Sequence, residues 1–343
     1  MMNKSSKRAD DILAMSSEYS PSNDTPAQEV IKWFTSQSDH KEKFKESIRT
    51  AIDEVLDGGR TGRYSISELT KNEKSYIGTK VEIILQESFS IPKGIKRPGV
   101  KEKPLDYRIL EHEVDCKFTI GKNWSIPSEA VDKICLLVQV DEEKEHFSAG
   151  ILRMRPEFLT SGSNRDGKKG VSVSGKEQVY WIADCEKFPR TLLLSLPANE
   201  RRGILSESLS GQERINRLFW TKQQILIDGT TIDTVAQQRD SMARAREGKG
   251  RARTVLRSKG ILIAGHWETH RRVMEQLAVD LPRMPRSGEM VSFRVVKKKA
   301  WHSDRPSITL DGKSWVLATD QELCEEGPRL PPIKAKKSSK SNQ

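Results

Sequence analysis

Apolar and polar positions in the first quarter of the chain recur at helical spacing. From about residue 26 to residue 57, apolar side chains return every three or four positions, in two segments divided by the polar stretch SQSDHKE. This pattern predicts two helices. After the turn DGGRTGR, the stretch SISELTKNEKSYIG favours a short helix. The next run, KVEIILQESF, alternates and is rich in β-branched residues, so it predicts a strand.

The middle of the chain is typical of a sheet. The segment IPKGIKRPGVKEKP is too rich in proline and glycine to form a strand. The runs after it predict strands, with a helix at SEAVDKI between the second and the third: LDYRIL, HEVDCKFTI, CLLVQV, SAGILRMR, GVSVSG and QVYWIAD. We therefore expect an α/β (α+β) domain, a mixed sheet flanked by helices.

The last two fifths of the chain have a different pattern. LPANERRGILSESLSGQERI loses apolar periodicity and predicts a linker. Four helical patterns follow, then two β-ribbon patterns: QERINRLFWTKQQILI, TIDTVAQQRDSMARARE, RARTVLRSKGI, HRRVMEQLAVDLP, EMVSFRVVKKKAWH and ITLDGKSWVLAT. Arginine-bearing helices followed by a small basic hairpin are the order of a winged helix, so we expect a mainly α, winged-helix-like DNA-binding domain.

These patterns divide the chain into five parts. The polar Ser/Asp/Lys-rich start and the Pro-then-Lys/Ser end are expected to be disordered. The predicted parts are a disordered N-terminus over 1–25, the sheet domain over 26–196, a linker over 197–211, the winged-helix-like domain over 212–330 and a disordered basic tail over 331–343.

Composition narrows the class of protein. The chain has 343 residues, of which 35% are hydrophobic and 31% charged, values that suit a soluble protein large enough for two cores. No run approaches the roughly 18 apolar residues of a membrane span, and the first residues lack the apolar core of a secretion signal. Four cysteines without a C-x-x-C pair, Cys116, Cys135, Cys185 and Cys324, indicate reduced thiols in the cytoplasm.

Charge is distributed unevenly along the chain. The formal net charge is +11, and residues 206–343 carry +10 of it with 26 Lys+Arg and 16 Asp+Glu. A one-sided basic charge attracts polyanions without regard to sequence, so nucleic acid is the leading candidate partner. A ribosomal or acidic protein partner also fits the charge alone.

The most informative residues lie in LDYRILEHEVDCKFTI. Side chains alternate faces on a strand, so Glu113, Asp115 and Lys117 point one way while Val114, Cys116 and Phe118 point the other. A strand this apolar on one face is expected within a sheet, where charges on the opposite face suit a metal site.

Hydrolysis of a phosphodiester needs such a site. Mg²⁺ prefers a few carboxylates and several waters, and it polarises the phosphoryl group and activates the attacking water. Asp106 and Asp115 supply carboxylates, Glu82 in KVEIIL is a third acid, and Lys117 is placed to stabilise charge on the phosphoryl group. Taken alone, however, D-x-K is short and common, and it more often marks an ordinary ion pair.

The wider context resembles a nuclease superfamily. An acid on one element, a second acid and then Asp115-Cys116-Lys117 resemble the PD-(D/E)xK nucleases, with Leu105-Asp106 in place of the usual Pro-Asp. The stretch VLDGGRTGRYSISELTKNEKSYIGTKVEIIL followed by LDYRILEHEVDCKF is similar to the NaeI-type restriction endonucleases. The similarity covers the sheet domain most clearly and extends loosely through the basic domain.

That resemblance implies a fold, a reaction and a site. It implies a restriction-endonuclease-like sheet domain and a winged-helix-like domain, each able to hold a DNA duplex, in a bacterial or archaeal cytoplasmic protein. It implies Mg²⁺-dependent cleavage of double-stranded DNA by a homodimer at a short palindrome, activated by a second DNA copy. Glu82, Asp106, Asp115 and Lys117 match the family's catalytic positions, with the three acids binding the metal.

A basic run in the second domain is the candidate DNA surface. Acids are sparse in it, whereas a merely solvated helix face usually intersperses them, so phosphate contacts are the better interpretation. A minority of these cations suit guanine edges in the major groove. The candidate residues are Arg244, Arg246, Lys249, Arg251, Arg253, Arg257 and Lys259.

Two other motifs point to chemistry that we do not expect. His266 and His270 stand four apart, but the intervening residues do not form a metalloprotease signature and no third zinc ligand is evident. Val55-Leu56-Asp57-Gly58-Gly59-Arg60 resembles the ligase motif K-x-D-G-x-R, with valine in place of the nucleophilic lysine. Ligation is therefore not predicted, and a turn ending a helix is expected there.

Three functions remain open on sequence alone. The first is the restriction endonuclease just described. The second is a repair or nicking nuclease with the same chemistry, and the third is a non-catalytic DNA-binding regulator, against which the intact set of acids and lysine argues. The recognition sequence, the cleavage position and the arginines that read bases depend on loop geometry and DNA shape.

Overall fold

The computed structural model describes residues 23–95 and 104–333, which fall into two compact units. The first unit comprises residues 23–55 and 66–190, and the second comprises residues 56–65 and 191–333. The expected disordered tail and most of the expected disordered N-terminus lie outside the described residues, as does most of the loop IPKGIKRPGVKEKP.

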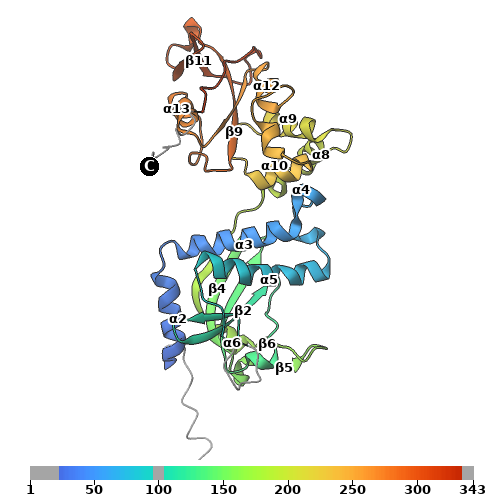
Figure 1. Ribbon diagram of the computed structural model, residues 1–343, viewed down its shortest axis with the longest axis vertical. Helices are drawn as coiled ribbons and strands as arrows, with labels where there is room; N and C mark the ends of the chain where they lie inside the picture. Colours follow the sequence, from blue (N-terminus) through green and yellow to red (C-terminus); the bar gives the residue numbers. More distant parts are fainter. Residues whose placement is uncertain (1–22, 96–103, 334–343) are drawn as a thin grey trace, which may run out of the picture. The chain divides into compact units, whose positions relative to one another are not determined.

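The first unit is built on a five-stranded mixed sheet (Figure 1). The strand order is β1-β2-β3-β4-β7, in which β2 and β3 are parallel and all other neighbours are antiparallel. This confirms the mixed sheet expected from the strand-like runs. Its strands are β1 (Tyr107–Ile109), β2 (His112–Thr119), β3 (Ile134–Asp141), β4 (His146–Arg153) and β7 (Tyr180–Lys187).

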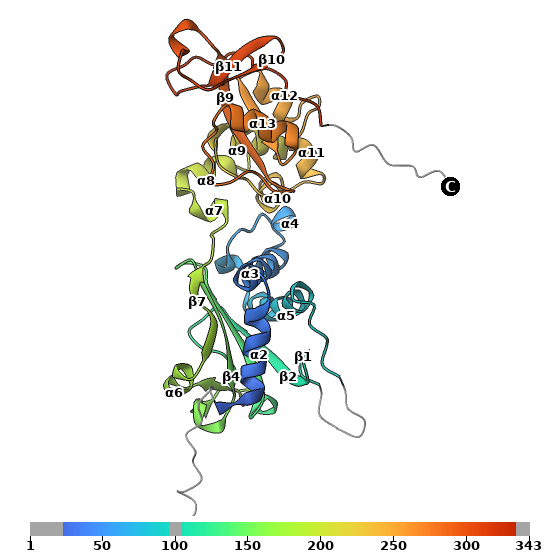
Figure 2. The same ribbon diagram turned by 90° about the vertical axis from the view of Figure 1, so that its left-hand side faces the viewer.

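Three long helices cover one face of this sheet (Figures 1 and 2). They are α2 (Thr25–Ser36), α3 (His40–Leu56) and α5 (Lys71–Ser88), with the 3-10 turn η2 (Ile66–Glu68) before α5. The first two confirm the helices predicted over 26–57. Asp24, which we placed in a disordered segment, is buried, caps α2 through Ala27 and forms an ion pair with Arg153.

The expectation of a strand at KVEIILQESF is wrong. These residues form the C-terminal half of α5, which begins with a capping box between Thr70 and Glu73. The residues of α5 that are buried lie at helical spacing, namely Ile77, Val81, Ile84 and Leu85. The alternation in KVEIIL comes from Val81, Ile83 and Leu85, of which Ile83 is exposed, and the capping box upstream marks the segment as a helix.

Smaller elements complete the first unit. They are the two-stranded sheet β5 (Leu159–Ser163) and β6 (Lys169–Val171), helix α6 (Val173–Glu177), and the 3-10 turns η3 (Ser128–Ala130) and η4 (Pro156–Phe158). GVSVSG is therefore only partly a strand, because Ser172 caps α6. SEAVDKI forms a single 3-10 turn in place of the expected helix.

The second unit joins a group of short helices to a four-stranded antiparallel sheet. Its sheet has the order β10-β11-β9-β8. The helices are α4 (Gly58–Thr61), α7 (Leu192–Ser195), α8 (Ala198–Ile204), α9 (Gly211–Thr221), α10 (Gly229–Ala236), α11 (Ser241–Ala245), α12 (Ala252–Arg257) and α13 (Glu268–Gln276). Helix α8 occupies part of the segment expected to be a linker. The longer of the two stretches that form this unit begins at Thr191, before that segment.

The sheet lies between two hydrophobic clusters. Ile261 and Ile263 join the cluster of α9, α10 and α12, while Leu262 and Ala264 join the cluster of α13. Strand β8 is thus buried on both faces, so its sequence ILIAG does not alternate between apolar and polar residues. Because that alternation is absent, the sequence does not predict this strand. The strands are β8 (Ile261–Gly265), β9 (Met290–Lys297), β10 (Ser307–Leu310) and β11 (Lys313–Leu317), with the 3-10 turn η5 (Ala300–His302) after β9.

The turn DGGRTGR is a tight structural feature of the second unit. Asp57 and Gly62 both adopt the left-handed conformation at the ends of α4, which confirms the turn expected after the preceding helix. A Cβ atom on Gly58 would lie 2.1 Å from Oγ1 of Thr234 in α10, so only glycine fits this close approach. Over residues 23–95 and 104–333, no helix combines the length and apolarity that a membrane crossing requires.

Candidate active site and nucleic-acid surface

Strand β2 presents the D-x-K pair on the face that the sequence predicted. Strand β1 pairs with β2 on one side, and β3 pairs with it on the other, with Asp115 opposite Cys135 and Lys117 opposite Leu137. Asp115 is only 5% exposed. The Lys117 side chain is 21% exposed, and its Nζ lies 2.6 Å from Oδ2 of Asp115. The pair is therefore an internal ion pair of the sheet.

Asp106 joins this pair from the start of β1. Its Oδ2 accepts a hydrogen bond of 2.8 Å from the backbone N–H of Cys116. The Asp106 carboxyl group lies close enough to Asp115 to raise the pKa of Asp115. Two neighbouring acids of this kind disfavour the ionised form, so a cation between them would be stabilised.

Glu82 reaches the same site from α5 rather than from a strand. The hydroxyl of the buried Tyr107 donates a 2.8 Å hydrogen bond to the backbone oxygen of Glu82, which fixes this part of α5 against β1. Burial raises the pKa of Glu82, the positive charge of Lys117 opposes that rise, and the charge of Asp115 adds to it. The Glu82 carboxyl group therefore interacts with the charges of both Asp115 and Lys117.

The charges of this site are strongly perturbed. Burial raises the pKa of Asp115 to about 6, against the opposing charge of Lys117 and with a further rise from Asp106. Burial disfavours the Lys117 ammonium group, but the neighbouring Asp115 carboxylate outweighs that effect and raises the pKa of Lys117. Such perturbed groups on one strand are typical of a functional site.

The acids suit a hard divalent cation. Within the described ranges, no three His, Cys, Asp or Glu side chains converge closely enough to hold a metal by themselves. Mg²⁺ is commonly held by one or two carboxylates and by waters, so Asp106 and Asp115 are sufficient as ligands. A proton held by Asp115 would leave when a cation binds, because metal ligands must be deprotonated.

The predicted cations of the second unit gather around the start of α12. A pocket of about 350 Å³ is lined by Arg239, Arg244, Lys249 and Arg251, together with Asp240, Gln212, Ala243 and Gly250. Asp240 adopts the left-handed conformation where α10 gives way to α11. Four cations face one acid in this pocket, a composition that suits a phosphate group.

The other predicted cations have different environments. Arg246 lies 6.0 Å from the ring of Trp267, and Lys259 is exposed after α12. Arg257 is half-buried and bound to Glu326 at 2.8 Å. Arg253 is only 7% exposed, and its Nε donates to the backbone oxygen of Ile263. A buried guanidinium of this kind is structural, so we withdraw Arg253 from the candidate DNA contacts.

Trp124 and His270 have structural roles. Trp124 is buried, and its indole N–H donates to the backbone oxygen of Val138. His270 is buried, and its Nδ1 accepts a hydrogen bond from the backbone N–H of Gly265. In the part of the chain that the structure describes, His266 and His270 belong to no metal-binding group.

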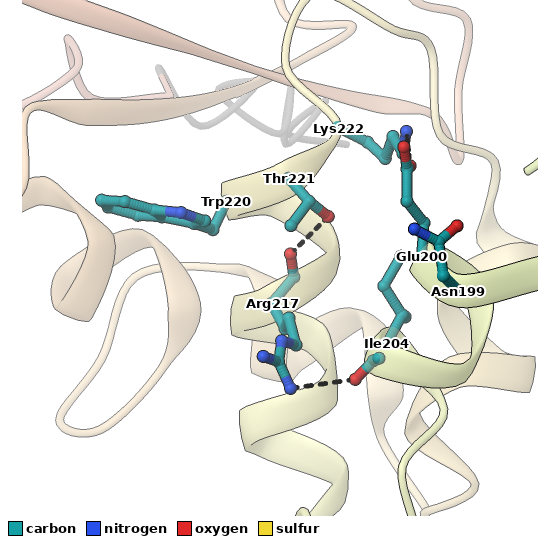
Figure 3. A pocket seen from close by; sticks show the side chains of 8 residues that line it. Asn199, Glu200, Ile204, Arg217, Trp220, Thr221 and Lys222 are labelled. Carbon is teal, nitrogen blue, oxygen red and sulfur yellow. Dashed lines mark hydrogen bonds and ion pairs between the residues drawn. The ribbon is translucent and has the colours of Figure 1, made fainter. Parts of the chain in front are cut away.

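A further pocket of about 450 Å³ lies between α8 and α9 (Figure 3). Its charged groups already have partners, since Lys222 pairs with Glu200 and Arg217 donates to the backbone oxygen of Gly203. Thr221 likewise donates to the backbone oxygen of Arg217. These internal bonds tie α8 to α9, and they suit a structural role better than an anion site.

Comparison with known proteins agrees with the geometry of the first unit. The family model described as "Restriction endonuclease NaeI" matches residues 28–326. The chain is also 35% identical over 291 residues to the "Type II restriction enzyme NaeI" of Lentzea aerocolonigenes, which covers 83% of this chain and 87% of that protein. Both matches extend over the two units.

Proposed function

Since this chain belongs to the NaeI restriction endonuclease family and is a site-specific deoxyribonuclease, we propose that it makes Mg²⁺-dependent double-strand cuts at a short palindrome. It acts as a homodimer, because a protein with twofold symmetry matches a DNA site with twofold symmetry. Its proposed location is the cytoplasm. A second DNA copy, bound by a winged-helix-like C-terminal unit, activates cleavage.

One observation supports the catalytic assignment above all others. The buried Asp115 carboxylate is held between the Lys117 ammonium group and the Asp106 carboxyl group. A structural ion pair on a sheet has no need of a second acid beside it, whereas phosphodiester hydrolysis needs both acids and a cation. Asp106 and Asp115 are the proposed metal ligands, and Glu82 is the third acid of the set.

Each side chain has a proposed task. Restriction endonucleases generally use divalent metal ions, and Mg²⁺ bound here would polarise the phosphoryl oxygen and lower the pKa of the attacking water. Lys117, kept charged by Asp115, stabilises negative charge that develops on the phosphoryl group and orients the water. The backbone N–H of Cys116 holds Asp106 in place.

The C-terminal unit supplies the proposed effector site. The cationic pocket at the start of α12 binds phosphates, with the exposed Lys249 and Arg251 as its main donors. Arg244, Arg246, Lys249, Arg251 and Lys259 remain in the proposed contact set, with Arg257 at its margin because of its bond to Glu326.

Digestion of a fully sequenced plasmid tests the proposed function. Purified protein is incubated at low salt with and without Mg²⁺ and with added duplexes that carry the mapped site. Discrete linear fragments that require Mg²⁺ are expected, and the duplexes should accelerate their formation. Cleavage without Mg²⁺ would contradict the metal assignment, and unchanged rates with the duplexes would contradict activation.

The same digestion separates the remaining candidates. A nicking enzyme would convert supercoiled plasmid to open circles without linear product. A regulator would shift DNA on a gel and leave it intact. Cleavage by the Asp115→Asn variant at the wild-type rate would remove the active-site assignment even if the wild-type protein proves to be a restriction enzyme.

A further inference from the structure

Helix α5 contains a glycine that its packing does not require. Gly78 lies near the middle of this 18-residue helix, and glycine is among the poorest helix-forming residues. A Cβ atom at this position would meet Cβ of Phe118 at 3.6 Å and Cδ1 of Phe118 at 3.9 Å, both of which are ordinary van der Waals distances. Alanine would therefore fit between α5 and β2, and it would favour the helix.

The glycine borders a groove. Lys71, Lys74 and Ser75 of α5 line this groove with Gly78, opposite Phe118, Thr119 and Ile120 at the end of β2. Its volume is about 370 Å³. A side chain at position 78 would project into that space, so glycine leaves the groove free of a side chain at this position.

The groove adjoins the proposed catalytic residues on both of its walls. On α5, the groove residues and Glu82 recur at intervals of three or four positions, which places them on one face of the helix: Lys71, Lys74, Ser75, Gly78 and Glu82. On β2, the groove-lining residues Phe118, Thr119 and Ile120 follow Lys117 directly along the chain, with Thr119 on the face of Lys117 and Phe118 on the other face. The groove therefore begins next to the proposed catalytic residues in both elements.

The lining has the chemistry of a phosphate-binding surface. It offers the ammonium groups of Lys71 and Lys74 and the hydroxyl groups of Ser75 and Thr119, and no acid lines the groove. The nearby Glu73 is engaged in the capping box with Thr70. Ammonium and hydroxyl donors of this kind commonly bind phosphate oxygens in protein–DNA contacts.

We propose that this groove holds the sugar-phosphate backbone of the strand being cut, next to the scissile phosphate. Lys71 and Lys74 bind its phosphates, and Gly78 is retained because any side chain there obstructs the strand. All three are positioning residues. The proposal rests on the proposed function, and it assigns a part of the molecule outside the predicted set of Glu82, Asp106, Asp115 and Lys117.

The first test compares Gly78→Ala with Thr79→Ala in the full chain. Both changes favour the helix, but Thr79 is exposed and does not line the groove. We expect both variants to raise the midpoint of thermal unfolding. Only Gly78→Ala should raise KM for cleavage of a plasmid bearing the mapped site, by about tenfold (about 1.4 kcal/mol), with a smaller change in kcat.

Lys74→Gln provides an independent readout. Its kcat/KM should fall less steeply with salt than that of the wild-type protein, by about 0.9 in the logarithmic slope for one lost phosphate contact, and Lys74→Arg should restore the slope. Lys80→Gln is the matched control, because Lys80 lies on the same helix but pairs with Glu54 outside the groove.

Two results would overturn the proposal. If Gly78→Ala lowers the unfolding midpoint, then packing explains the glycine. If that variant is stabilised and cleaves with an unchanged KM, then the groove does not hold the cut strand, although the enzyme is still an endonuclease. Failure of the wild-type protein to cut any DNA in Mg²⁺ would instead remove the proposed function, and the groove proposal with it.

Discussion

The two units place their functional charges in opposite environments. In the first unit, Asp115 and Lys117 are largely buried within a sheet, and their pKa values are both raised. In the second unit, Lys249 and Arg251 are exposed beside a shallow pocket. Arg253, two residues after the exposed Arg251, is buried and donates a hydrogen bond to the backbone oxygen of Ile263 instead.

This difference suits the task that we propose for each unit. Bond cleavage gains from charges held away from water, because electrostatic interactions strengthen as the local dielectric falls. Binding a polyanion gains from cations in solvent, which release counterions when they meet phosphates. A run of charged residues in a sequence can therefore indicate either a buried catalytic group or an exposed phosphate-binding surface. The burial of the side chains distinguishes the two.

The largest expected effect is at the buried pair. Lys117→Ala should lower the single-turnover rate of plasmid cleavage in Mg²⁺ by at least about a hundredfold, because a preorganised cation at the phosphoryl group is lost. Lys187→Ala, an exposed lysine on β7, is the matched control and should cut normally. Normal cutting by both variants would contradict the contrast between the units.

The two units should also respond to acid in opposite directions. Burial, together with the charge of Arg253, lowers the pKa of His270 to about 4. In the unfolded chain the His270 imidazole becomes protonated near pH 6.5, whereas in the folded unit it stays neutral until about pH 4. The second unit therefore loses up to about 3 kcal/mol of stability between pH 6.5 and 4. Asp115 has a raised pKa, so its contribution to the first unit grows over the same fall in pH.

Hydrogen exchange of the metal-free protein at pH 7 and pH 5 measures this difference unit by unit. Core amides of β8 and α13 should lose protection relative to those of β2 and β3 on acidification. His270→Gln should abolish the loss in the second unit, because glutamine keeps an acceptor for Gly265 without titrating. Equal responses of the two units would refute the prediction.

A pair of arginines sharpens the contrast within the second unit. Arg251→Gln should reduce the slope of log affinity against log salt by about 1 for an effector duplex, because an exposed phosphate contact is lost. Arg253→Leu should leave that slope unchanged, since its guanidinium is bound to Ile263 inside the unit. Fluorescence anisotropy in a Lys117→Ala background measures both, and a reduced slope for Arg253→Leu would return Arg253 to the contact set.

The smallest expected effect concerns helix starts, where the two units are alike. Thr70 and Ser210 each form a capping box, at α5 and at α9. Thr70→Ala should cost about 1 kcal/mol of stability and affect the first unit, whereas Ser210→Ala should affect the second. Denaturant unfolding followed by hydrogen exchange assigns each loss, and a loss shared by both units would show that they unfold together.

Much of the candidate site was evident in the sequence. Alternation along HEVDCKFT places Asp115 and Lys117 on one face of a strand, and the structure agrees. Glu82 was assigned to a strand, and it lies on a helix. The error arose because Val81, Ile83 and Leu85 alternate within KVEIIL as the residues of a strand would, while the capping box that marks the start of the helix lies ten residues upstream of that run.

Local periodicity, charge distribution and motif spacing determined the mixed sheet, the basic charge of the second unit and the placement of Asp115 and Lys117 on one face of a strand, because each depends on neighbours along the chain. Only the tertiary structure decided that Asp24 caps a helix, that Arg253 is buried and that Gly78 borders a groove. Burial depends on which distant segments pack together, and the one-dimensional order of residues does not contain that information until the chain has folded.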